Sequence, residues 1–270
     1  MKLSTAATGL CLAGWLATAL LAHDLYVWPE TFRLKAGEIL VVALNHGDLY
    51  PESAGVAPLA RLGETKLIGA GGTIELKDFT ESHNALVKSV KLDNTMTGSL
   101  VLTAMLKANM REHDAKEFAK YIEDERLEMV AQYRRDHAEQ DKPAKEIYSK
   151  YAKALVVNGA PSAFSTRPVG LKIEVVPGVD LATLKPGESL PIQVLFGGKP
   201  AAGLVIETAW TTGGLGESAT VGRTDSRGRL LVPLQRGKCR ITTAMSERYA
   251  DQTVANWETF LATLVFEVGR

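Results

Sequence analysis

The residue best placed for metal chemistry is a histidine near the start of the chain. His23 lies in the stretch ALLAHDLYVWP, directly after Ala22. A chain that begins at this histidine carries an α-amine with an unperturbed pKa of about 8 and an imidazole with one of about 6.5. Both groups lose protons close to neutral pH, so together they can chelate one ion. A second imidazole in the same plane would complete a nitrogen-rich tetragonal set, which suits Cu(II) or Ni(II) better than Mg²⁺ or Ca²⁺.

The residues before His23 have the features of a secretory signal. Lys2 gives a short positive segment, residues 10–21 form an uncharged apolar run, and Ala22 is a small residue at the cleavage position. A membrane anchor is the alternative, but the run is shorter than the roughly 20 residues that a spanning helix needs. We therefore expect residues 1–22 to be a signal peptide and His23 to begin an exported, periplasmic chain.

The second imidazole must come from elsewhere in the fold. His46 follows the run EILVVAL, which we expect to pair with the strand holding residues 24–28. His83, in ESHNA, is a looser candidate from another loop. The predicted metal ligands are therefore His23, His46 and His83. The remaining histidines, His113 and His137, flank a helical segment and are expected on the surface.

Simpler explanations exist for these histidines. His23 could be only the residue that signal peptidase leaves exposed, and His46 a turn residue that caps a strand. Asp48 and Glu52, in the loop after His46, are candidates for weak or outer-sphere oxygen ligands. Neither Cys-x-x-Cys nor His-Glu-x-x-His occurs, so the strong zinc signatures are absent.

The composition excludes several function classes. Lys plus Arg and Asp plus Glu both number 31, so no excess of positive charge favours nucleic acid or a membrane surface. No stretch after the signal is long and apolar enough to cross a membrane. Cys239 stands alone after cleavage, and its strand-like context predicts a buried side chain. Nucleophile elbows, phosphate-binding glycine loops and cysteine–histidine pairs are missing, so we expect a protein that is not an enzyme.

The chain divides into three regions after the signal. Short alternating runs separated by turn residues predict an N-terminal antiparallel β-sandwich at 23–111. A charged, glycine-free stretch predicts a helical hairpin within 112–160. Runs flanked by glycine or proline predict a second sandwich, immunoglobulin-like or transthyretin-like, at 161–270. The expected fold class is mostly β, with two antiparallel β-sandwich domains and an inserted helical hairpin.

The helical hairpin has its own sequence signals. Asp114 followed by Glu117 fits a helix N-cap with its capping-box partner. Pro143 is placed to restart a second helix, whose apolar face would include Ile147 and Leu155. Asn158 and Gly159 would end it.

A family resemblance extends along most of the mature chain. The pieces that carry it are AHDLYVWP, the expected helical pair KEFAKYIEDERLEMV and KEIYSKYAKALVVNG, TRPVGLKIEVVPG, LPIQVLFGGKPAAGLVIE, TDSRGRLLVPLQRG and NWETFLATLVFEV. In this order they resemble the NikM-like periplasmic proteins, often described as the periplasmic component of nickel or cobalt uptake. The resemblance implies metal binding and an inner-membrane cation transporter as partner. Several relatives carry a histidine in the strand that here reads ITTAMSERY, where this chain has Ala244 and Met245, so this chain lacks the ligand that a metal site at that position would use.

Two functions from different classes follow. In the first, an accessory protein binds nickel, cobalt or copper through His23 and hands the ion to a transport system. In the second, the sandwiches form a non-catalytic scaffold or protein-interaction module of the cell envelope, with sheet edges and the hairpin as contact surfaces.

Overall fold

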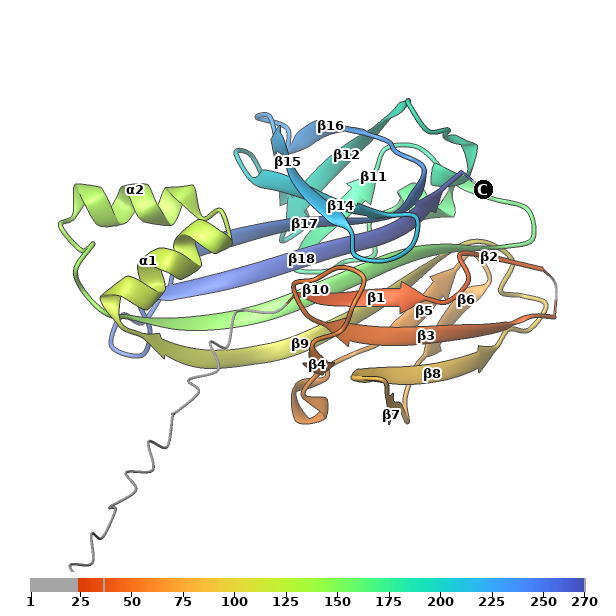
Figure 1. The fold of residues 1–270 in the computed structure, drawn as a ribbon, viewed down its shortest axis with the longest axis horizontal. Coiled ribbons are helices and arrows are strands. Elements are labelled where there is room, and N and C mark those ends of the chain that lie inside the picture. Colours follow the sequence, from red (N-terminus) through yellow and green to blue (C-terminus); the bar gives the residue numbers. More distant parts are fainter. Residues whose placement is uncertain (1–23, 36, 270) are drawn as a thin grey trace, which may run out of the picture.

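The described part of the chain is built mostly from β-strands, as the sequence predicts (Figure 1). The structure is a computed structural model that describes residues 24–35 and 37–269. The predicted signal peptide at 1–22 and the predicted ligand His23 lie outside the described residues.

A nine-stranded sheet forms the middle layer. Its strands, in order across the sheet, are β15 (Glu217–Arg223), β14 (Val205–Thr211), β17 (Gly237–Arg248), β18 (Trp257–Val268), β10 (Ala144–Asn158), β9 (Gly98–His113), β5 (Lys66–Gly69) and β6 (Gly72–Glu75), with β2 (Arg33–Leu34) paired to β10. Strand β10 runs parallel to β18 and to β2, and the other neighbours are antiparallel.

Two smaller sheets cover the middle layer. The first contains β1 (Leu25–Pro29), β3 (Ile39–His46), β8 (Ala85–Lys91) and β7 (Thr80–Ser82) in this order, with β4 (Gly55–Val56) paired to β3. The second contains β11 (Ile173–Pro177), β12 (Ser189–Phe196) and β13 (Lys199–Pro200), with β16 (Arg229–Pro233) paired to β12. Short 3₁₀ turns lie at Leu59–Arg61, Ala163–Thr166 and Leu181–Thr183. Figure 1 shows the small sheets on opposite sides of the long strands.

Alternating side chains explain why both faces of the middle sheet are covered. On β9, Leu100 and Leu102 belong to the core shared with the first small sheet, whereas Val101 belongs to the core shared with the second. On β18, Leu264 packs into the second core and Val265 into the first. Because successive strand residues point to opposite faces, a strand that is apolar at every position needs a layer on each side.

The middle sheet joins strands from all three predicted regions. Strands β2, β5 and β6 and most of β9 lie in 23–111, β10 lies in 112–160, and β14, β15, β17 and β18 lie in 161–270. The hydrogen-bonded ladder therefore crosses both boundaries expected from the sequence.

The helical hairpin consists of α1 (Ala115–Asp124) and α2 (Glu128–Asp136), inserted between β9 and β10. The predicted capping box is confirmed, because the Glu117 backbone N–H donates to Asp114 Oδ1 at 2.8 Å and the Asp114 N–H donates to the Glu117 carboxylate at 3.2 Å. The predicted second helix after Pro143 is wrong: residues 144–158 form the long strand β10.

Buried charges explain why β10 looks helical in the sequence. Its spaced lysines and glutamate suggest the solvated face of a helix, yet Glu146, Lys150 and Lys153 are each 3% exposed or less. Lys153 Nζ lies 2.7 Å from the Glu174 carboxylate, and this ion pair is inside the protein. A strand covered on both faces shows no apolar–polar alternation, so the two-residue pattern that identifies a strand is absent from its sequence.

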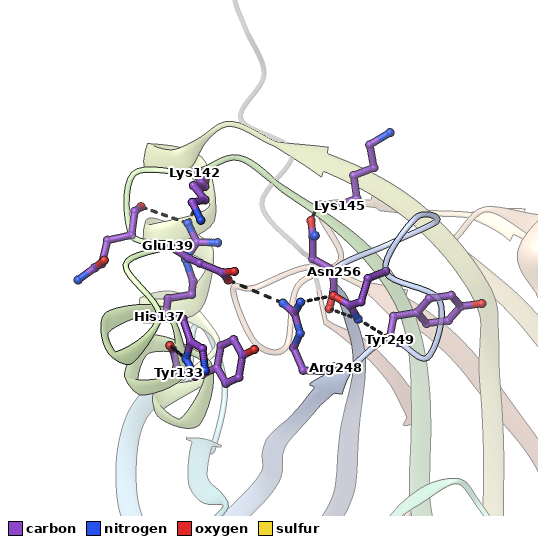
Figure 2. Close-up of polar contacts among 11 residues, drawn as sticks. Tyr133, His137, Glu139, Lys142, Lys145, Arg248, Tyr249 and Asn256 are labelled. Carbon is purple, nitrogen blue, oxygen red and sulfur yellow. Dashed lines mark hydrogen bonds and ion pairs between the residues drawn. The ribbon is translucent and has the colours of Figure 1, made fainter.

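Polar contacts fasten the hairpin to the turn between β17 and β18 (Figure 2). The Arg248 guanidinium lies 5.0 Å from the ring centre of Tyr133 on α2 and 3.8 Å from the carboxylate of Glu139. At the start of β10, just after the hairpin, the Lys145 backbone N–H donates to Asn256 Oδ1 at 2.7 Å and the Asn256 N–H donates to the Lys145 carbonyl at 2.8 Å, which anchors the end of the hairpin segment to the same turn. The hairpin is thereby held over one end of the middle sheet.

Candidate functional site

The register of the first sheet brings the start of β1 beside His46. Leu25 is the partner of His46 across the β1–β3 pair, and the Gly47 N–H donates to the Asp24 carbonyl at 3.0 Å. The predicted pairing of EILVVAL with the strand at 24–28 is confirmed. Residue 23 directly precedes Asp24 in the sequence. His46 lies at the end of β3 that pairs with the start of β1.

His46 faces a buried amine. Its Nε2 lies 3.4 Å from Nζ of Lys150, which is 3% exposed on β10. The His46 backbone N–H donates to the Ser53 hydroxyl at 2.8 Å. That hydroxyl also lies 2.8 Å from the Asn84 carbonyl, so the loop after β3 is tied to the turn between β7 and β8.

His83 lies in that turn, at the same end of the first sheet as His46. It is exposed, has a φ of +48°, and its Nδ1 lies 2.9 Å from the Ser82 hydroxyl. Within residues 24–35 and 37–269, no group of three or more His, Cys, Asp or Glu side chains has the spacing of a metal site. The ligand set predicted from the sequence includes His23, which lies outside these ranges.

The other two histidines differ in exposure. The expectation that His113 lies on the surface is wrong: it is 3% exposed, and its Nε2 lies 3.2 Å from the Glu146 carboxylate. Its ring also stacks on Tyr121 of α1, with the ring centres 5.2 Å apart. His137 is exposed at the end of α2, as expected.

A buried arginine joins the ends of β1 and β3. The Arg240 guanidinium, on β17, lies 3.2 Å from Asp24 Oδ2. It also donates to the carbonyls of Gly47 and Asp48, at 3.4 and 3.5 Å. Its guanidinium carbon lies over the ring of Tyr26 at 5.3 Å. One cation therefore fixes both strand ends that flank the proposed metal ligands.

A cavity of about 330 Å³ opens beside this arginine. Its walls come from the ends of β1 and β3, from α1, and from β14, β15 and β17. Five carboxylates line it, against one lysine and one arginine: Asp24, Asp48, Asp124, Glu125 and Glu207, with Lys120 and Arg240. The cavity is therefore acidic and reaches the residue that follows position 23.

Burial perturbs the ionisable groups around the cavity. It raises the pKa of Asp24, and the neighbouring Arg240 guanidinium opposes the rise. It raises the pKa of Glu125 well above its ordinary value, and the nearby Asp24 carboxylate adds to the rise. It lowers the pKa of Lys150, and the carboxylates of Asp24 and Glu125 oppose that change. Such clusters of desolvated charge are concentrated at functional sites.

Sequence reasoning missed Arg240, Lys150 and Glu125. Arg240 lies between buried apolar positions in KCRITT, and a charged residue at an inward strand position was the available signal. Lys150 was hidden by the assignment of its segment to a helix. Glu125 ends α1, and its role depends on the hairpin folding back over the sheet.

A family comparison covers most of the chain. The family model described as "Domain of unknown function (DUF4198)" matches residues 20–239. The chain belongs to the DUF4198 family. This match includes Asp24, His46 and Lys150, and it ends one residue before Arg240. No curated protein matches this DUF4198 chain.

Solved structures similar to this DUF4198 protein are distant. A DUF4785 family protein from Legionella pneumophila matches 80% of this chain and 52% of its own, at 12% identity and a TM-score of 0.27. The chain thus spans about half the length of that relative. Escherichia coli alpha-2-macroglobulin activated by porcine elastase matches 92% of this chain and 22% of its own, at 10% identity and a TM-score of 0.23. Within the described residues, no helix reaches the length and apolarity that a membrane crossing requires.

Proposed function

We propose that this protein is a NikM-like member of the DUF4198 family that binds a divalent transition-metal ion in the periplasm and hands it to an inner-membrane cation transporter. The candidate ions are nickel, cobalt and copper. The observation that supports the proposal is the β1–β3 register, which pairs Leu25 with His46 and brings the first residues of β1 beside an imidazole.

His46 offers donor chemistry suited to such an ion, although Lys150 Nζ lies 3.4 Å from its Nε2 and would have to move aside. The proposed donors are the α-amine and imidazole of His23 and the imidazole of His46, a nitrogen-rich set that favours Cu(II) or Ni(II). Asp24 and Asp48 supply negative charge next to these donors, and Lys150 and Arg240 keep that charge partly compensated. His83 is exposed at the same sheet end and serves at most as an outer partner.

In this proposal the neighbouring residues position the donors. Arg240 holds the Asp24 carboxylate and two carbonyls of the loop after β3, which fixes the separation of the two strand ends. We therefore propose a carrier and not an enzyme.

Removal of the His46 imidazole tests the proposed site. Isothermal titration of the processed protein with CuCl₂ and with NiCl₂ should show at least a tenfold loss of affinity in His46→Ala, because one nitrogen donor is gone. The matched control is His137→Ala, which removes an exposed imidazole at the end of α2. Equal affinity in both variants would contradict the metal site and leave the scaffold hypothesis standing.

A further inference from the structure

The middle sheet ends on one side in an exposed edge strand. Within the described part of the chain, β15 pairs with β14 and with no other strand, and residues 217–220 are all exposed. Because successive strand residues point to opposite faces, neither face of this stretch is covered. No backbone hydrogen bond outside the β14 pair involves residues 217–223 in the same described ranges. The outward N–H and C=O groups of β15 are therefore available to a further strand.

Other edge strands of this protein carry features that discourage pairing. Strand β7 has three residues with Glu81 at its centre, and β13 has two residues and ends in Pro200. Short edges, charged side chains and proline all oppose the addition of a strand. Strand β15 has seven residues, and its central Ser218, Ala219 and Thr220 include neither a charge nor a proline. This edge therefore lacks the usual protection against a partner.

The two ends of β15 carry opposite charges. Glu217 begins the strand and Arg223 ends it, and both side chains are exposed. Arg223 contacts Glu128 of α2, but a surface ion pair of this kind is weak and leaves the guanidinium accessible. When two copies of β15 meet in antiparallel directions about a two-fold axis, the acidic end of each lies beside the basic end of the other. A parallel meeting would bring like charges together, so the strand is complementary to itself only in the antiparallel arrangement.

Apolar side chains extend this edge beyond the strand. Leu215 is 56% exposed and Leu49 is 64% exposed. The Gly216 N–H donates to the Tyr50 carbonyl at 2.6 Å, which holds the two loops together. At the other end, the half-buried Val221 is the extra residue of a bulge in the β14–β15 pair. The antiparallel arrangement brings the Leu215 end of each copy beside the Val221 end of the other, which removes apolar surface from water.

We propose that β15 is the interface of a symmetric dimer, in which β15 of one copy of this chain pairs antiparallel with β15 of a second copy. The pairing joins the two middle sheets into one continuous sheet. Lys plus Arg and Asp plus Glu both number 31, so no net charge keeps two copies apart. The dimer goes beyond the proposed function and does not depend on it, because no residue of β15 is a proposed metal ligand.

Sedimentation equilibrium of the processed protein, without added metal, tests the dimer. We expect a reversible dimer that the charge reversals Glu217→Arg and Arg223→Glu each weaken at least about tenfold, because both symmetric contacts become repulsive. An equimolar mixture of the two variants should recover the dimer, since an all-basic strand then faces an all-acidic one. The matched control is Glu81→Arg, which reverses an exposed charge on the edge strand β7 and should leave the dimer unchanged.

Two further measurements locate the interface. Glu128→Gln removes only the contact that Arg223 makes within its own chain, and it should leave dimerisation unchanged. Amide hydrogen exchange in residues 217–220 should slow as the protein concentration rises, whereas exchange in Thr80–Ser82 of β7 should not. Circular dichroism melts establish that each variant is folded. A protein that stays monomeric into the millimolar range, or a dimer that neither reversal weakens, would overturn the proposal. A mixture that dimerises no better than either variant alone would do the same.

Discussion

At the scale of single residues, Arg240 organises the candidate site. It is 5% exposed and compensates the Asp24 carboxylate, which is 8% exposed. Buried ion pairs contribute little net stability, but removing one partner leaves the other charge buried without a counter-charge, which is strongly destabilising. The arginine is therefore a positioning residue whose loss should have a stability cost and, under the proposed function, should also weaken metal binding.

The variant Arg240→Met should lower the free energy of unfolding by about 3–5 kcal/mol, the usual cost of an uncompensated buried charge. Urea denaturation measures this change, and Arg236→Met, which removes an exposed arginine in the preceding loop, should change it by less than about 0.5 kcal/mol. The double variant Asp24→Asn/Arg240→Met should recover part of the loss. A double variant as unstable as the sum of its parts would show that the two groups do not interact.

Tyr26 predicts a change of stability at alkaline pH. Burial raises its pKa to about 12, and its hydroxyl donates to the Glu52 carbonyl at 2.7 Å. Unfolded tyrosine ionises at about pH 10, so the stabilisation from Tyr26 is complete below that pH and is lost as pH rises towards 12. Between about pH 9 and 12, the unfolding free energy should fall by about 2–3 kcal/mol more in the wild type than in Tyr26→Phe. Parallel curves for the two proteins would contradict the assignment, and Tyr249→Phe serves as the control.

Residue-scale predictions from the sequence succeeded where the signal was local. Cys239 is fully buried, as its strand context predicts, and His46 has the expected strand partner. Lys150 and His46 are 104 positions apart in the sequence, yet Lys150 Nζ lies 3.4 Å from His46 Nε2. The sequence could not reveal this contact, because it depends on how two sheets pack. The burial of His113 was missed for the same reason, since α1 covers it only after the hairpin folds back.

At the scale of elements, the hairpin that covers the cavity depends on the N-cap of α1. Asp114 satisfies the Glu117 N–H, and α1 carries Tyr121 and Glu125 into the cavity wall. The variant Asp114→Ala should cost about 1 kcal/mol, the usual value for a lost N-cap, and should raise amide hydrogen exchange within Ala115–Asp124. Asp141→Ala, which removes an exposed aspartate outside the helices, is the control. Unchanged exchange in α1 would show that packing alone holds its first turn.

The sequence pattern did not predict the long strand β10, whose segment it indicated as a helix. Its capped neighbour α1 was predicted correctly because capping is a local signal that spans four residues. Lys153 in β10 looks solvated in the sequence but pairs with Glu174, whose carboxylate also accepts from the Val169 and Gly170 N–H groups. Glu174 lies 21 positions away in the sequence, and no residue close to Lys153 indicates that the lysine has a buried partner.

At the scale of the whole molecule, the fold gathers distant segments around the start of β1. The cavity wall combines Asp24 with Asp48, Glu125, Glu207 and Arg240, from five separate parts of the chain. The shared middle sheet makes this possible, because β10, β14 and β17 lie in one layer over which both β1 and α1 pack (Figure 1). The composition, with its balanced charges, does not show that acidic groups collect in one place.

The most direct test of the central claim compares two proteins that differ only at the N-terminus. One begins at His23, and the other carries a single additional glycine before it, which turns the free α-amine into an amide. Isothermal titration with CuCl₂, together with electron paramagnetic resonance of the bound Cu(II), should give at least tenfold weaker binding and a changed nitrogen coordination in the extended chain. Equal affinities and identical spectra would contradict the claim that the exported terminus binds the metal.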